Sequence, residues 1–300
     1  MRKKKSARNY ARVQKHKDVT INLPINYWQL FKFTYRTNIT LIFKISITLA
    51  LFAIPLFTAL YFRGVITTGI TKQSAPADLT KNLMSFQGWY GFVVLAAFLI
   101  LSIGICGVSY AMKRQLRNEG VMFFRDFKTG IKKNCLAFLG ITLLYFGFLA
   151  ILNYVLNLFW FKSEVPYYPI LLVVFIIISV LVFMMWTLAV MINMNYKCGF
   201  FMLLKSSFLL TFARFPHLLL SLVCSVAPLI VAVTIGYVPV LFAAMVIYIA
   251  IGFGHSTLLI SLINFYIFDE LINKRQFPEA YRKGLFSGEQ VQPIDEGFHV

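Results

Sequence analysis

Acidic residues are scarce in this sequence of 300 residues, which holds 11 Asp and Glu against 29 Lys and Arg. No acid lies deep in any long apolar stretch, and Lys44, near the start of the first stretch, can extend its amine to the membrane surface. Ionisable side chains are costly inside a bilayer, and they mark ion pathways or catalytic sites there. Their scarcity argues against a proton-coupled pump, a charge-selective channel and a metalloenzyme.

The sequence also lacks the common cysteine and histidine motifs. Its four cysteines are widely spaced without a CxxC pair, so they predict neither a disulfide framework nor a zinc site. No HExxH spacing and no Ser-His-Asp set accompanies His217 or His255. We therefore expect no enzyme, no metal and no cofactor. A proton relay or ligand role for His255 is the minor alternative to a packing role.

Long apolar runs dominate what is present. The chain is 59% hydrophobic and 17% aromatic, with a mean hydropathy of +0.74, which lies well outside the range of soluble globular proteins. These values predict an all-α, polytopic membrane helical bundle. The net charge of +18 fits the preference for Lys and Arg in cytoplasmic loops, and no recognition motif indicates nucleic-acid binding.

Six stretches are long enough to cross a hydrocarbon core of about 30 Å, and they pair as three hairpins. The outer connections are a polar segment at 64–88 and a tight one at 162–168. The fifth stretch is the shortest and is joined to the sixth by residues 236–239 alone, so a re-entrant hairpin is the alternative for this pair. The predicted spans are residues 37–62, 89–112, 135–161, 169–195, 218–235 and 240–267.

Basic residues are divided unequally between the two sides of this topology. With both termini inside, Arg63, Lys72, Lys81 and Lys162 lie outside, which leaves the other 25 of the 29 basic residues inside. This ratio predicts cytoplasmic N- and C-termini. Residues 1–22 are then a basic cytoplasmic tail, residues 23–268 the membrane domain, and residues 269–300 a cytoplasmic C-terminal tail.

The segment 113–134, between the second and third spans, mixes basic with apolar residues, a pattern typical of a lipid headgroup surface. Similar segments at 26–38 and 201–217 precede the first and fifth spans and predict an amphipathic interfacial helix before each hairpin. We interpret segment 113–134 as a surface for anionic lipids of the inner leaflet or for a partner. Its basic residues are Lys113, Arg114, Arg117, Arg125, Lys128, Lys132 and Lys133.

A few polar residues within the spans are candidates for a solute path. Asn153 and Asn157 share one face of the third span because they are four residues apart, and Trp186 lies in the fourth span. Amides beside aromatic rings suit a neutral, hydroxyl-rich ligand such as a sugar. Amides also join helices to one another, and this packing role is the favoured interpretation.

Small residues recur in the sixth span. Ala250, Gly252, Gly254 and Ser256 form two overlapping pairs, each with small residues four positions apart. Small residues at this spacing let two helices approach closely. The pattern predicts a tight helix contact there.

Three stretches resemble the YesL-type family of bacterial integral membrane proteins. They are RQLRNEGVMFFRDFKTGIKKN at 114–134, LLKSSFLLTFARFPHLLL at 203–220 and INFYIFDELINKRQFPEAYRKGLF at 263–286. The resemblance implies a multi-pass protein of the bacterial cytoplasmic membrane, without an established activity and associated with ABC-type permeases in carbohydrate uptake. It assigns no catalytic or binding residues.

Two functions are compatible with these observations. The first is a non-enzymatic accessory or scaffold protein that presents its basic inner face to anionic lipid and to a permease. The second is a carrier for a small neutral solute, which needs no buried charge. The sequence does not indicate an oligomeric state.

Overall fold

The structure is a computed structural model that describes residues 24–74, 76–160, 168–196, 198–235 and 238–285. All regular elements in these ranges are helical, as the apolar composition predicts. The predicted tail at 1–22, most of the connection 162–168 and the residues from 286 onward lie outside the described ranges. The longer helices are α2 (Tyr27–Gln73), α3 (Pro76–Leu116), α4 (Phe123–Trp160), α5 (Tyr168–Asn195), α6 (Phe200–Ala213), α7 (Phe215–Ile235), α8 (Val238–Ile247) and α9 (Phe253–Phe268).

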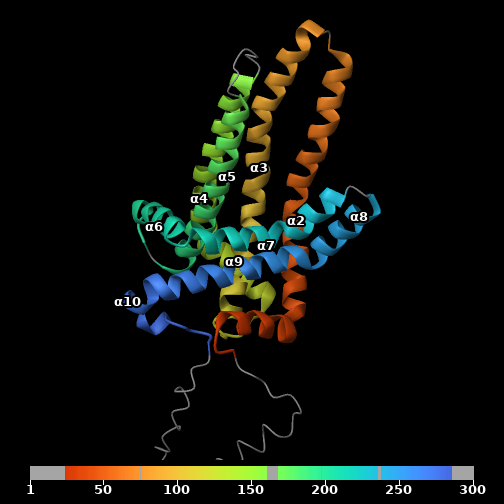
Figure 1. The fold of residues 1–300 in the computed structure, drawn as a ribbon. Coiled ribbons are helices and arrows are strands. Elements are labelled where there is room, and N and C mark those ends of the chain that lie inside the picture. Colours follow the sequence, from red (N-terminus) through yellow and green to blue (C-terminus); the bar gives the residue numbers. More distant parts are fainter. Residues whose placement is uncertain (1–23, 75, 161–167, 197, 236–237, 286–300) are drawn as a thin grey trace, which may run out of the picture.

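Four long helices, α2 to α5, stand upright in Figure 1, and α7 and α9 lie side by side across them. The short π-helix η1 (Tyr248–Gly252) joins α8 to α9, and a second π-helix, η2 (Asp269–Asn273), follows α9. Within the described ranges, five helices are long and apolar enough to cross a membrane. They become six if the bent pair of α6 and α7 counts as one span. The chain therefore has the helices of a multi-pass membrane protein.

Two backbone breaks separate short leading helices from longer ones. Asn38 (φ −131°, ψ 35°) interrupts α2, and Arg214 (φ −132°, ψ 33°) separates α6 from α7, which meet at 87°. In Figure 1 the first part of α2 runs across the base of the molecule before the helix turns upward. These breaks agree with the leading helices predicted at 26–38 and 201–217. The basic segment 113–134 differs, because it comprises the end of α3, the turn that follows and the first turns of α4.

The predicted polar connection at 64–88 is largely helical. Helix α2 continues to Gln73, and α3 begins at Pro76. No proline occurs between residue 64 and residue 73, and α2 continues through Gly64 and Gly69. Pro76 occupies the first turn of α3, where its missing N–H costs nothing. The two helices therefore extend beyond the predicted spans and form a long hairpin.

The main hydrophobic core lies where α9 crosses α2 and α3. Ile42, Val108 and Leu258 are fully buried there. Gly254 makes this crossing close, because a Cβ atom added to it would lie 2.2 Å from the carbonyl oxygen of Ile42. This contact confirms the tight helix contact predicted from the small residues of the sixth span.

Replacement of Gly254 by alanine should destabilise the fold. The added methyl group meets backbone rather than a flexible side chain, and such overpacking costs about 1–3 kcal/mol. Gly140→Ala is the matched control, since Gly140 is also helical and has no atom within 4 Å of its added Cβ. Thermal unfolding in mild detergent should show a lower Tm for Gly254→Ala alone. An unchanged Tm for Gly254→Ala would contradict the close crossing.

Candidate functional site

The basic residues of segment 113–134 fall into two groups. The first group, at the end of α3, is engaged in internal contacts. Lys113 Nζ donates to the carbonyl oxygen of Met194 at 2.7 Å, and a guanidinium nitrogen of Arg117 donates to Asn195 Oδ1 at 3.0 Å. Both acceptors belong to the last turn of α5, where unpaired carbonyl groups and the helix dipole favour cations. These two residues therefore fix the end of α5 to the end of α3.

Arg114 is the third member of the internally engaged group. Its Nη1 lies 2.5 Å from Oδ1 of Asp126, whose side chain is only 2% exposed. Oδ2 of Asp126 also accepts the backbone N–H of Met122 at 2.9 Å, so this carboxylate both caps the start of α4 and neutralises the arginine. The turn between α3 and α4 is therefore held by the ion pair.

Glu119 links the turn between α3 and α4 to residues 282–285, which we call the C-terminal segment. Lys283 Nζ donates to its carboxylate at 2.8 Å, and the side chain of Asn118 donates to the carbonyl oxygen of Gly284 at 2.9 Å. Burial opposes ionisation of Glu119, but the hydrogen bond from Lys283 and the neighbouring arginines hold its pKa below the usual range. The turn thus binds a segment more than 160 residues away in the sequence.

A buried carboxylate, Asp269, joins the remaining parts of this end of the molecule. Its Oδ2 accepts the hydroxyl of Tyr27 at 2.5 Å and the backbone N–H of Arg282 at 2.8 Å. Its Oδ1 accepts the side-chain amide of Asn273 at 2.6 Å, and Asn273 Oδ1 accepts the hydroxyl of Tyr196 at 2.6 Å. The Asp269 network therefore connects the start of α2, the end of α5, η2 and the C-terminal segment.

This network departs from the expected C-terminal tail at 269–300. Asp269 is 5% exposed and Leu285 is 7% exposed, so the chain contacts the membrane domain at these two positions, whereas residues 274–279 are exposed. The packing follows from the donors that surround the carboxylate, since a buried charge is tolerated when hydrogen bonds satisfy it. Sequence reasoning missed Asp269, Tyr27 and Asn273. The i, i+4 spacing of Asp269 and Asn273 is the sequence signal from which their hydrogen bond could have been predicted.

The second group of basic residues lies on an exposed face of α4. We name the residues Arg125, Lys128 and Lys132, together with the exposed apolar side chains of Met122, Phe124 and Leu136, the α4 basic face. Among the residues that the structure describes, the side chains of Arg125, Lys128 and Lys132 form no ion pair or hydrogen bond. Lys133 lies at the edge of this face, with Nζ 5.9 Å from the ring centroid of Tyr110. These cations are available to external anions.

Of the three residues of the predicted solute path, Asn153 and Asn157 lie one turn apart in α4, and Trp186 is not brought together with them. Trp186 is buried, donates to Thr142 Oγ1 at 3.1 Å and packs against the ring of Phe146. The side chain of Asn157 donates to the carbonyl oxygen of Asn153 one turn earlier in α4. The bond of Trp186 joins α5 to α4, whereas the bond of Asn157 stays within α4 and joins no second helix.

Two cavities lie near these residues. A distal cavity of about 310 Å³ is lined by Asn153, Arg63 and Phe98, and a central cavity of about 190 Å³ is lined by Trp186, Ser261 and Phe98. Phe98 belongs to both linings and stacks on Phe146 with ring centroids 4.1 Å apart. Asn157 lines neither cavity. An aromatic stack therefore lies where the two cavities adjoin.

No cluster of three or more His, Cys, Asp or Glu residues suited to a metal ion occurs in the described ranges. The chain matches no protein-family model, no curated protein and no solved structure. The geometry supports best a surface for binding anions. It is built on the Asp269 network, at the end of the bundle that holds the turn between α3 and α4, which we call the basic end.

Replacement of Asp269 by asparagine should destabilise the basic end. The amide can no longer accept hydrogen bonds at both oxygen positions, so donors from Tyr27 and Arg282 lose a charged acceptor, at a cost of about 2–3 kcal/mol. Thermal unfolding in detergent should show a lower Tm. The exposed Glu279→Gln is the control and should leave the Tm unchanged. Equal Tm values for the two variants would contradict the role of Asp269.

Proposed function

We propose that the protein is a non-enzymatic accessory or scaffold of the bacterial cytoplasmic membrane, similar to the YesL-type family. In this proposal both termini are cytoplasmic, and the α4 basic face meets anionic lipid of the inner leaflet and the subunits of an ABC-type permease for carbohydrate uptake. The unpaired cations of Arg125, Lys128 and Lys132 support it most directly. Cations that stabilise the fold are already satisfied, whereas these three are exposed and free to bind an acidic partner.

The charge distribution supports the orientation. The loop between α3 and α4 and the C-terminal segment gather at the same end of the bundle, whereas the tip of the α2–α3 hairpin lies at the opposite end (Figure 1). Lys72 and Lys81 flank that tip. The preference for basic residues in cytoplasmic loops supports a cytoplasmic position for the first end.

The apolar part of the α4 basic face supports a protein partner. Phe124 is 75% exposed, Met122 68% and Leu136 87%, and they lie on either side of the free cations along the chain. Aromatic and methionine side chains beside arginine are enriched in protein interfaces. Exposed aromatic and aliphatic side chains in this position can also enter the headgroup region of a bilayer. The same face therefore has the composition to contact both lipid and a permease.

Charge reversal on the α4 basic face should abolish partner recovery. We would express a tagged chain carrying Glu in place of Arg125, Lys128, Lys132 and Lys133, solubilise native membranes in mild detergent, and quantify co-purified permease subunits by mass spectrometry. The matched control is Lys72→Glu with Lys81→Glu, an exposed pair at the opposite end. Recovery should fall to below about a tenth in the first variant, because like charges now oppose an acidic partner. Unchanged recovery with both variants would contradict the proposal.

A carrier for a small neutral solute is the second candidate, and the adjoining distal and central cavities favour it. Asn153 contributes an amide to the distal lining, and Phe98, which lines both spaces, stacks on Phe146 of the distal lining. A path for an uncharged solute needs no ion-coupling residue.

The carrier hypothesis predicts solute flux in proteoliposomes that depends on Asn153. Asn153→Leu should remove flux of a neutral sugar, since the substitution deletes the amide that lines the distal cavity. Asn157→Leu is the matched control, because Asn157 lies in the same helix and lines neither cavity. Absence of flux across a broad sugar panel, or equal loss in both variants, would contradict this second candidate.

A further inference from the structure

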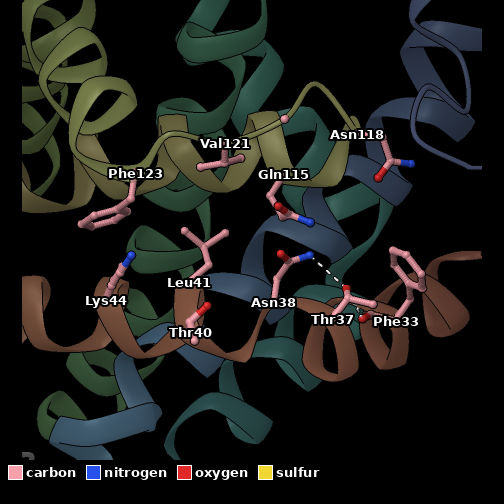
Figure 2. A pocket seen from close by; sticks show the side chains of 11 residues that line it. Phe33, Thr37, Asn38, Thr40, Leu41, Lys44, Gln115, Asn118, Val121 and Phe123 are labelled. Carbon is pink, nitrogen blue, oxygen red and sulfur yellow. Dashed lines mark hydrogen bonds between the residues drawn. The ribbon is translucent and has the colours of Figure 1, made fainter.

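A polar pocket of about 420 Å³ lies between the broken part of α2 and the turn that joins α3 to α4 (Figure 2). No acidic residue lines it in the part of the chain that the structure describes. Its polar side chains are Thr37, Asn38, Thr40, Lys44, Gln115 and Asn118.

The backbone break at Asn38 creates this pocket. Because the chain changes direction there, the side chains of Asn38 and Lys44 both reach the space below the turn. Figure 2 shows Asn38 and Gln115 pointing toward one another, and Lys44 pointing toward Phe123. The pocket is therefore formed by two separate elements that meet at the basic end.

Lys44 supplies the charge of the pocket. It is exposed, and its amine forms no ion pair or hydrogen bond with any residue in the described ranges. The side-chain amide of Gln115 is also without a hydrogen bond to those residues, whereas Asn38 donates to Thr37 Oγ1 at 2.9 Å. A lysine amine is a common ligand for phosphate. One free cation beside free amide and hydroxyl groups suits a phosphate that carries hydroxyl groups.

Exposed apolar side chains continue from the pocket along α2. Ile47, Leu51 and Ile54 lie three, seven and ten residues after Lys44, which places them on the same side of the helix, and all three are exposed. A ligand whose phosphate lies at Lys44 would therefore have an apolar strip beside its remaining part. This strip suits acyl chains and offers nothing to a free phosphate ion.

The lining also discriminates between headgroups. An ammonium headgroup, as in phosphatidylethanolamine, would need a carboxylate partner, and the pocket has none among its lining residues. A glycerol headgroup has hydroxyl groups that can pair with the amides of Gln115 and Asn38. The chemistry therefore favours an anionic, hydroxylated phospholipid.

We propose that this pocket binds the phosphate and hydroxylated headgroup of an anionic glycerophospholipid, with Lys44 as the phosphate ligand and Gln115 and Asn38 as headgroup ligands. The site is separate from the α4 basic face. The inference rests on the proposed orientation, in which this end meets the inner leaflet, and it does not depend on the docking of a permease.

Native mass spectrometry of the purified full chain tests the site. Protein in detergent would be mixed with dioleoyl phosphatidylglycerol or dioleoyl phosphatidylethanolamine, and the bound fraction of each lipid measured. The wild-type chain should retain more phosphatidylglycerol. Lys44→Gln should lower that retention about tenfold, because a charge-assisted hydrogen bond is lost, and Lys44→Arg should preserve it. Lys72→Gln removes an equal charge from an exposed position at the opposite end of the bundle, outside the pocket and the α4 basic face, and should also preserve it.

Several results would overturn the proposal. They are equal retention of the two lipids by the wild-type chain, unchanged retention in Lys44→Gln, and displacement of phosphatidylglycerol by excess inorganic phosphate, which would identify a soluble phosphate ligand. Gln115→Ala gives a second test if Lys44→Gln fails to fold, and it should lower retention as well. Partner recovery unaffected by Lys44→Gln but lost on reversal of the α4 basic face would separate this site from the proposed scaffold function.

Discussion

The buried carboxylate of Asp269 is the interaction on which the basic end of the molecule depends. Its oxygens accept hydrogen bonds from the start of α2, from η2 and from the C-terminal segment, and Asn273 extends the network to the residue that follows α5. A buried carboxylate is tolerated in this position because three hydrogen bonds satisfy its oxygens. Four chain segments are therefore held in one arrangement, and the turn between α3 and α4 is positioned against them.

This arrangement gives the cations of the basic end different roles. Lys113, Arg114 and Arg117 satisfy carbonyl, carboxylate and amide groups within the fold, whereas the cations of the α4 basic face have no polar partner among the described residues. Lys44 also has none in those ranges and lies in a pocket of its own. The positive charge at this end is therefore partly structural and partly available for binding. Only the available part is relevant to lipid and to a partner.

Much of the fold could be predicted from local sequence patterns. Apolar runs identified the spans, and mixed aromatic and basic residues identified the leading helix that ends at Asn38. The spacing of small residues identified the close contact at Gly254. The helical extensions to Gln73 and from Pro76 were missed, because polarity at 64–88 was interpreted as a connection although no proline interrupts either helix there.

Local sequence patterns could not predict which basic residues form internal contacts and which remain free. Lys113 contacts a carbonyl group 81 residues away, and Asn118 contacts one 166 residues away. Such contacts depend on how distant helices meet, and a local pattern of charge does not contain that information. The same reason explains why Asn153 and Trp186, both chosen as polar or aromatic residues within spans, line different cavities.

The central claim is that one end of the bundle carries free cations and faces the cytoplasm. The most direct measurement is site-resolved lysine modification by a membrane-impermeant amine reagent, in sealed cells and in inverted membrane vesicles, quantified by mass spectrometry. We expect Lys128 and Lys132 to react in inverted vesicles, Lys72 and Lys81 to react in cells, and Lys113 to resist the reagent in both because its amine is engaged with Met194. Modification of Lys128 and Lys132 from outside the cell, or equal reactivity of Lys113 and Lys128, would contradict the account.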